Sequence, residues 1–266
     1  MDIVEIFGYS GAFLIGLVLG LIGGGGAILT VPLLVYALAL NPVTATAYSL
    51  FVVGATSLIG ALKNMAKGMV DFKTAIPFAI PAFVTIYLTR AYLVPALPKE
   101  LFKIGGFAVT KDLAIMLFFA MVMLSASLTM IGERSLGPKT YNAPLLITQG
   151  LIVGLVTGII GAGGGFLIIP ALVLLAKLPM KKAVATSLFI IGINSLTGFF
   201  GDVQNLDIDW PFLLTFTGIS IMGITMGIWI NNFIEGKKLK KTFGWFVLIM
   251  GVYILYKELS LTHIHA

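Results

Sequence analysis

Hydrophobic residues fill this chain in long runs that polar residues interrupt only briefly. Eight of the runs have the roughly 17–21 residues that cross about 30 Å of hydrocarbon at about 1.5 Å per residue, and two are shorter. The pattern predicts an all-α polytopic integral membrane protein with 8–10 membrane segments. The apolar runs cover residues 3–22, 27–40, 44–62, 74–94, 112–131, 142–160, 166–176, 183–200, 210–230 and 242–258.

The composition excludes a soluble protein. Of the 266 residues, 59% are hydrophobic and 11% charged, and the mean hydropathy is +1.06. A soluble domain has about 45–50% apolar and about 25% charged residues. The net charge of +6 comes from lysines and arginines that lie almost wholly between the apolar runs, where they orient a membrane protein. We therefore expect a multi-pass protein of the cell membrane, in contact with lipid and not with nucleic acid.

The second half of the chain repeats the first at a spacing of 138 residues. Between residues 16 and 60, 22 of the 45 positions are identical to the residue 138 positions later. Glycines, prolines and serines align in register, which a shared apolar composition alone does not produce. We predict two homologous repeats, residues 1–131 and 142–266, joined by a polar linker loop at 132–141.

Each repeat opens with a helix that a glycine cluster must interrupt. The clusters read GGGG at 23–26 and GAGGG at 161–165. An unbroken helix over residues 3–40 would be about 57 Å long, nearly twice the hydrocarbon thickness. Each glycine also costs about 1 kcal/mol in a helix interior. Each repeat is thus predicted to contain a glycine-broken helix pair followed by three transmembrane helices.

The relative orientation of the repeats depends on the short helices. If they span the membrane, each half crosses five times and the repeats are inverted; if they only dip in, each half crosses four times and the repeats are parallel. With the acidic loop 201–209 placed outside, the first arrangement puts 12 basic residues inside and 5 outside, and the second puts 11 and 6. The charge count does not separate the two, and we take inverted repeats as the working interpretation.

The sequence offers no catalytic chemistry. It has no P-loop motif for ATP, no cysteine, and only two histidines, both in the C-terminal tail. Every Asp and Glu falls at or near a predicted loop, so we expect no buried carboxylate. These features predict a protein that is not an enzyme and that has no cofactor and no metal site.

The glycine breaks are the main candidate for a binding site. Irregular backbone at membrane depth is tolerated only where it lines a cavity or packs in protein, and the helix that follows each break directs a partial positive charge toward it. Two such breaks in corresponding positions indicate an anion site in a secondary transporter. Alternatively, the glycines only permit close packing, as Gly16 and Gly20 are expected to do. The predicted backbone donors are Gly23, Gly24, Gly25, Gly26, Gly161, Gly163, Gly164 and Gly165.

Polar side chains in the run that follows each short helix would complete the lining. Asn194 is the strongest of these, because an amide in an apolar run needs hydrogen-bond partners; the hydroxyls could instead hold neighbouring helices together. Arg90 lies within an apolar run and could be a counter-ion, but its position near the end of the run favours snorkelling to the interface. The predicted lining residues are Ser49, Thr186, Ser187 and Asn194.

Three sequence patterns resemble the TauE/SafE family of sulfite-exporter-like permeases. Residues 158–170 read GIIGAGGGFLIIP and fit the family pattern G-x-x-G-x-G-G-G-x-x-x-x-P, from which GLIGGGGAILTVP at 20–32 departs only at Ala27. Residues 183–188 read AVATSL, and 45–50 match them more loosely as ATAYSL. A G-x-V-D-[WF] pattern is complete at 68–72, and its second copy keeps only the IDW of 208–210. The resemblance covers about residues 8–258 and implies a permease for sulfite, sulfonates or other small anions.

Together these observations predict a secondary transporter. We expect it to move a small anion, such as sulfite or another sulfur-containing anion, by alternating access without ATP. A passive anion channel that uses the same glycine breaks is the alternative. A proton or a sodium ion could be the coupling ion, and the sequence leaves the substrate, the direction of transport and the oligomeric state open.

Overall fold

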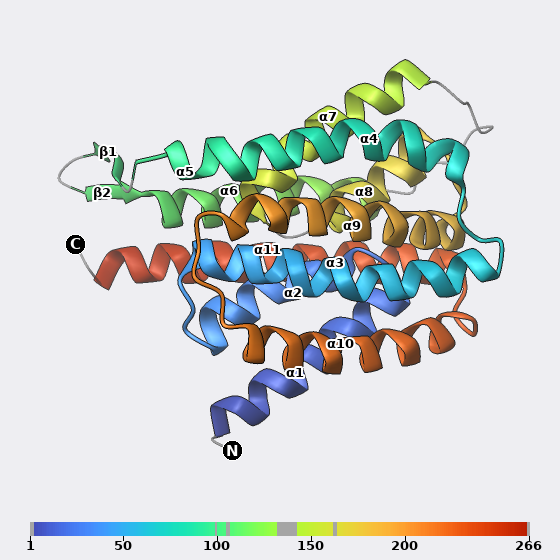
Figure 1. Ribbon diagram of the computed structural model, residues 1–266, viewed down its shortest axis with the longest axis horizontal. Coiled ribbons are helices and arrows are strands. Elements are labelled where there is room, and N and C mark those ends of the chain that lie inside the picture. The colour runs from blue at the N-terminus through green and yellow to red at the C-terminus, as the bar shows by residue number, and fades with distance from the viewer. Residues whose placement is uncertain (1–2, 99, 105–106, 132–142, 162–163, 265–266) are drawn as a thin grey trace.

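The protein is a bundle of helices that lie roughly along one common direction, as the computed structural model shows (Figure 1). It describes residues 3–98, 100–104, 107–131, 143–161 and 164–264. All ten predicted apolar runs form helices, which confirms an all-α polytopic membrane protein. The helices are α1 (Ile3–Ile22), α2 (Gly25–Pro32), α3 (Pro42–Ala66), α4 (Phe72–Leu88), α5 (Val94–Ala96), α6 (Lys111–Ile131), α7 (Ala143–Ile160), α8 (Gly165–Pro170), α9 (Met180–Val203), α10 (Trp210–Asn231) and α11 (Gly236–Ile264).

Seven helices of the described chain are long and apolar enough to cross a membrane, and two further apolar helices are shorter. The short ones are Gly8–Ile22 and Ile28–Ala37, on either side of the first glycine cluster. The segment between α5 and α6, expected as a loop, contains a small antiparallel hairpin of β1 (Glu100–Ile104) and β2 (Phe107–Thr110). It lies at the end of the bundle, outside the helical core (Figure 1).

The first glycine cluster folds the chain back on itself. A Cβ added to Gly8 would meet Leu38, and one added to Gly11 would meet Leu33. At the other end, one on Gly26 would meet the backbone of Ile15. Residue numbers on one arm rise as those on the other fall, so α1 and the arm that follows it are antiparallel. The chain therefore enters and leaves this hairpin at the same end of the bundle.

The second glycine cluster likewise separates α7 from α8, which form the second hairpin (Figure 1). In each hairpin a wide helical turn follows a proline. Pro32 is the last residue of α2 and Pro170 the last of α8, and π-helices follow at η1 (Leu33–Ala37) and η3 (Ala171–Leu175). Proline has no N–H and its ring crowds the carbonyl four residues back, so the regular pattern of helical hydrogen bonds fails there. The two π-helices are 138 residues apart. A third π-helix, η2 (Thr89–Leu93), joins α4 to α5.

Helices α3 and α9 form the centre of the bundle. Their membrane windows are 72% and 78% buried, against 33–44% for the other five spanning helices. Gly54 of α3 packs on Leu196 of α9, and Gly192 of α9 packs on Leu58 of α3. The reversed order shows that α3 and α9, which occupy corresponding positions of the two sequence halves, run antiparallel.

The outer helices pack mainly between the halves. Helix α1 packs on α10, with Gly16 against the carbonyl of Ser220, as expected for close packing at glycine, and α4 packs on α7. Helix α6 packs on α11. The linker predicted at 132–141 lies outside the described residues. Because the main contacts join one half to the other, neither half encloses a core of its own.

Two reciprocal hydrogen bonds join the halves at opposite ends of the bundle. The Asp71 N–H donates to the Thr186 hydroxyl over 3.0 Å, and the Asp209 N–H donates to the Tyr48 hydroxyl over 2.7 Å. Both aspartates also cap their own helices, α4 and α10, through a carboxylate oxygen. Aspartate is a favoured N-cap because its oxygen accepts an otherwise unpaired N–H of the first turn. The pair is 138 residues apart, as are its partners.

Candidate anion-binding site at the glycine breaks

The two glycine breaks touch each other inside the protein. A Cβ on Gly24 would lie 2.0 Å from the carbonyl carbon of Gly165 and 2.1 Å from its Cα. A Cβ on Gly165 would lie 2.2 Å from the Cα of Gly24. Only two glycines permit backbones to approach this closely. The contact brings together the starts of α2 and α8, which the sequence predicted separately for each repeat.

Gly23 and Gly161 end the helices that precede the breaks. Their φ angles are +75° and +72°, a region that other residues rarely adopt. The Gly23 N–H donates to the Leu19 carbonyl over 2.7 Å, and the Gly161 N–H donates to the Thr157 carbonyl over 2.8 Å. These two predicted donors thus have partners inside their own helices. Their role in the structure is to terminate α1 and α7.

The N–H groups without a partner in their own helix belong to the helices that follow the breaks. Gly25 and Gly26 occupy the first turn of α2, where a helix has no carbonyl four residues earlier to accept their N–H groups. Gly165 begins α8, and Gly164 precedes it with a φ of +65°. A Cβ on Gly164 would lie 2.1 Å from the Thr157 hydroxyl, so glycine lets that hydroxyl approach the break. Gly163 lies outside the described residues.

One face of α9 lies against both breaks. A Cβ on Gly23 would lie 2.7 Å from the Ser187 hydroxyl, and one on Gly165 would lie 2.6 Å from Ile191. Asn194 follows Ile191 by three residues and therefore lies on the same helix face. Its side chain is 1% exposed, and neither amide atom has a hydrogen-bond partner among the residues that the structure describes. A buried amide without partners is costly, so this face contains a polar group available to a ligand.

The remaining predicted lining residues fall into two groups. Ser49 is fully buried, and in the described part of the chain its hydroxyl has no partner, like that of Thr157 at the second break. Ser187 donates its hydroxyl to the Val184 carbonyl over 2.8 Å. The Thr186 hydroxyl accepts the Asp71 N–H, which places it at the contact between the halves.

Arg90 is fully buried beside the second break. Its Nε donates to Asp202 Oδ2 over 2.7 Å, and the two side chains form an ion pair. Its Nη1 donates to the Gly158 carbonyl over 3.3 Å, and its Nη2 donates to the Thr46 hydroxyl over 3.1 Å. A Cβ on Gly161 would lie 2.3 Å from Thr46 Cβ, so the guanidinium is one residue removed from the glycine break.

Two sequence interpretations are wrong at this position. Arg90 does not snorkel to the interface, because its side chain is 0% exposed and has an ion-pair partner. A buried carboxylate does exist, because α9 continues through Asp202 rather than ending before the acidic loop. A lone arginine in an apolar run requires a nearby acid. That requirement could have directed attention to Asp202, the first acid after the run at 183–200.

The ends of the two broken helices are capped by different chemistry. The Leu21 carbonyl, in the last turn of α1, accepts a hydrogen bond from the amide of Asn231 on α10. The Gly158 carbonyl, in the last turn of α7, accepts one from the charged Arg90. A positive group near a helix C-terminus interacts favourably with its dipole. The two breaks therefore share their geometry and differ in charge.

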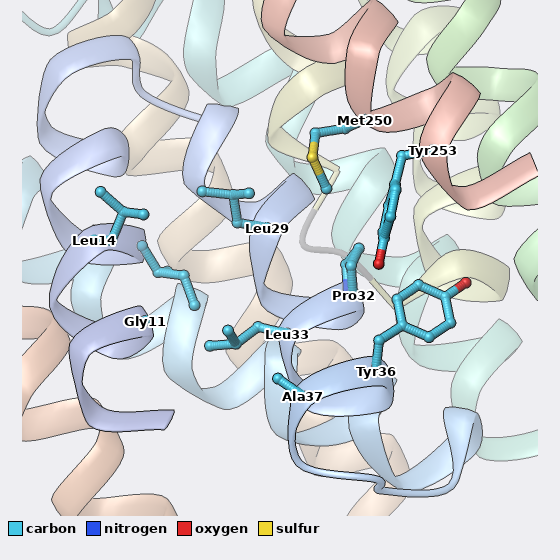
Figure 2. Close-up of a pocket in the computed structure, with 10 residues that line it drawn as sticks. Gly11, Leu14, Leu29, Pro32, Leu33, Tyr36, Ala37, Met250 and Tyr253 are labelled. Carbon is cyan, nitrogen blue, oxygen red and sulfur yellow. The ribbon is translucent and has the colours of Figure 1, made fainter. Parts of the chain in front are cut away.

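A separate pocket of about 260 Å³ lies between α1, the α2–η1 arm and α11 (Figure 2). Tyr36 and Tyr253 lie side by side at one end of it, with their rings edge to face at 5.9 Å. The Tyr36 hydroxyl donates to Glu258 over 2.6 Å. Leucines, Pro32 and Met250 line much of the rest, and none of the lining residues is a predicted anion ligand. This apolar pocket is distinct from the glycine breaks.

These features define a polytopic membrane protein whose two broken helical hairpins meet in its interior. The family described as "Sulfite exporter TauE/SafE" matches residues 9–254, and the chain belongs to that family. It is a membrane transporter of the TauE/SafE type, with several membrane-spanning helices. The sequence resemblance is thereby confirmed over nearly the whole chain.

The relatives are named as transporters. A "Probable membrane transporter protein" of Xylella fastidiosa is 26% identical over 255 residues, which cover 92% of each chain. YunE of Bacillus subtilis, a "Probable membrane transporter protein", is 28% identical over 92% of this chain and 98% of its own length. MJ0441 of Methanocaldococcus jannaschii is 38% identical over 117 residues, 42% of this chain and 44% of its own. No solved structure matches the chain.

Proposed function

We propose that the protein is a secondary carrier for a small anion, such as sulfite or another sulfur-containing anion, and that it works without ATP and catalyses no reaction. The anion would bind where the two glycine breaks meet. First-turn N–H groups of α2 and α8, with the unpaired amide of Asn194, would supply the hydrogen bonds. The observation that carries the proposal is the contact of Gly24 with Gly165, which packs on Ile191 of α9, one helical turn before that amide.

The charge distribution supports an orientation in the membrane. At the end where α3 and α10 finish, the described chain carries many lysines, whereas the opposite end has only Arg90, Lys103, Lys111 and Lys257. Basic residues favour the cytoplasmic side, so we place the lysine-rich end there. These lysines are Lys63, Lys67, Lys73, Lys177, Lys181, Lys182, Lys237, Lys238, Lys240 and Lys241.

Alternating access follows from the arrangement of the halves. Corresponding helices α3 and α9 run antiparallel, which supports inverted repeats. In inverted-repeat transporters the site lies between the repeats, and one repeat moves against the other around it. A site made by one break from each half has this geometry. Opening toward one side would break the hydrogen bond between the halves at that end and leave the one at the opposite end. The two bonds are Asp71 with Thr186 and Asp209 with Tyr48.

Counterflow in proteoliposomes distinguishes a carrier from a channel. The purified protein is reconstituted into vesicles loaded with unlabelled sulfite, methanesulfonate or thiosulfate, and entry of the same labelled anion is followed. A carrier shows faster entry when unlabelled anion is inside, because the loaded site returns more readily than the empty one. Entry that is rapid but independent of internal anion would show the passive channel instead.

A thermal-unfolding panel would identify the substrate class. Ligands that bind only the folded protein stabilise it by RT ln(1 + [L]/Kd), about 2.7 kcal/mol at a hundredfold excess over Kd. We expect sulfite or sulfonates to raise Tm more than sulfate or carboxylates at equal ionic strength. A selective rise with a carboxylate would reassign the substrate class, and no rise with any of these anions would contradict anion binding.

A further inference from the structure

We propose that Asp202 is the proton-binding group of this transporter, and that its protonation releases Arg90 to pair with the transported anion. The inference rests on the carrier function proposed above, and it names both the coupling ion and a second binding residue. It starts from the fact that the Arg90 charge is buried beside the second break and that, within the described part of the chain, Asp202 is its ion-pair partner.

The position of Arg90 connects the ion pair to the anion site. The guanidinium donates to Gly158 in the last turn before the break, and to Thr46, which packs directly on Gly161. Movement of the second hairpin would therefore change the hydrogen bonds of Arg90. The first hairpin has the neutral amide of Asn231 in the comparable role, so among the hydrogen bonds of the described residues the charged donor belongs to the second break.

Burial makes the two charges depend on each other. Arg90 is 0% exposed and Asp202 4% exposed, so neither charge is stabilised by water. If Asp202 gains a proton, the guanidinium remains charged and loses its counter-ion, which is highly unfavourable in an apolar interior. An anion arriving at the break would replace the lost negative charge. Proton uptake and anion binding therefore favour each other, and the coupling is reciprocal.

Asp202 is placed to exchange protons with water. It is the second-last residue of α9, and the next residues, Val203 and Gln204, are exposed at the end assigned to the outside. Among the described residues around the pair, α3 and α7 contribute only the uncharged Thr46 and Gly158. Helix α6 contributes Lys111, which acts on the Asp202 carboxylate through space, and its neighbour Asp112, which accepts a hydrogen bond from Asn41.

The charge balance of the cycle is simple. A proton from water binds the Asp202 carboxylate, and an anion takes the place of that carboxylate opposite Arg90. The site then opens toward the opposite side of the membrane and the anion leaves. Asp202 gives its proton through the emptied site to water on that side, and the ion pair forms again. One proton moves with each anion, so transport of a monovalent anion is electroneutral.

Proteoliposomes with a clamped membrane potential test this coupling. The labelled anion is whichever of sulfite, methanesulfonate and thiosulfate gives the strongest counterflow. With the outside one pH unit more acidic, a one-to-one cycle accumulates a monovalent anion about tenfold, because the two gradients balance. Asp202→Asn should retain anion counterflow and lose the accumulation. Asp207→Asn removes an exposed acid five residues further along and should accumulate the anion like the wild type.

Each outcome has one meaning. Absence of counterflow in the wild type would overturn the proposed carrier itself. Counterflow together with full accumulation in Asp202→Asn would overturn only the role of Asp202. A further measurement needs no variant. When the same anion is added to the detergent-purified protein in weak buffer, the protein should take up about one proton from solution per anion bound, as read by a pH-sensitive dye. Binding without proton uptake would also overturn the inference.

Discussion

Replacing Gly24 by alanine tests the contact between the two breaks directly. The φ of Gly24 is −58°, which any residue adopts, so the substitution introduces no backbone strain. The new methyl group would instead lie 2.0 Å from the carbonyl carbon of Gly165, where ordinary contact begins at about 3.4 Å. The two hairpins would have to separate by more than about 1 Å, because the atoms in the way are backbone and cannot rotate aside.

The expected cost is large for a single methyl group. Overpacking a well-packed interior costs about 1–3 kcal/mol, and a clash with backbone belongs at the upper end of that range. A loss of about 3 kcal/mol lowers the folding equilibrium constant roughly a hundredfold, since each 1.4 kcal/mol is a factor of ten. The separation occurs at the proposed anion site and would move the N–H donors away from the anion. Counterflow should therefore fall to near background.

The assay combines unfolding in detergent with counterflow in vesicles. Gly218→Ala is the matched control, because it makes the same change in α10 at a position with nothing within 4 Å. It should leave both measurements unchanged or raise stability slightly. Gly165→Ala should reproduce the loss seen with Gly24→Ala, since its methyl group would lie 2.2 Å from the Gly24 Cα. If the two site variants behave like Gly218→Ala, the breaks do not touch.

Two further substitutions test the buried polar groups. Arg90→Met should lower the unfolding free energy by about 3–5 kcal/mol, because Asp202 is left buried without a partner, and adding Asp202→Leu should recover part of that loss. Chemical unfolding measures both changes. No recovery in the double variant would show that the loss does not come from the unpaired Asp202 carboxylate. Asn194→Leu should raise the unfolding free energy by about 1–3 kcal/mol by removing an unpaired buried amide, yet weaken the anion-induced rise in Tm. A loss of stability with Asn194→Leu would mean that the amide has partners in the protein.

The sequence predicted the helices well because hydrophobic runs and glycine breaks are local features. The ten apolar runs are all helical, and the breaks lie where the 138-residue register placed them. The strands β1 and β2 were missed because segments of four or five residues are too short to show a clear periodicity. The fold-back of α1 on its own second arm was also missed, since the length of a helix does not show which way the next one runs.

The site was predicted only in part, because its defining contacts join residues far apart in the chain. Gly24 and Gly165 were each identified, but their mutual contact depends on how the halves pack. Thr186 was expected in the lining and its hydroxyl accepts the Asp71 N–H, whereas the next residue, Ser187, lies against Gly23. Asp202 was taken for a loop residue since an acid at a helix end looks the same in sequence whether it faces water or an arginine.

The packing of the halves has a consequence for how the protein is made. Synthesis delivers Arg90 to the membrane 112 residues before its partner Asp202, and α1 before its packing partner α10. Until then, the carboxylate that pairs with the guanidinium in the completed fold is missing, and the glycine surfaces of α1 are open to lipid. The first half must therefore wait in the bilayer, incompletely assembled, for the second. A ribosomal pause or a truncation after α9 begins should expose that intermediate to membrane proteases.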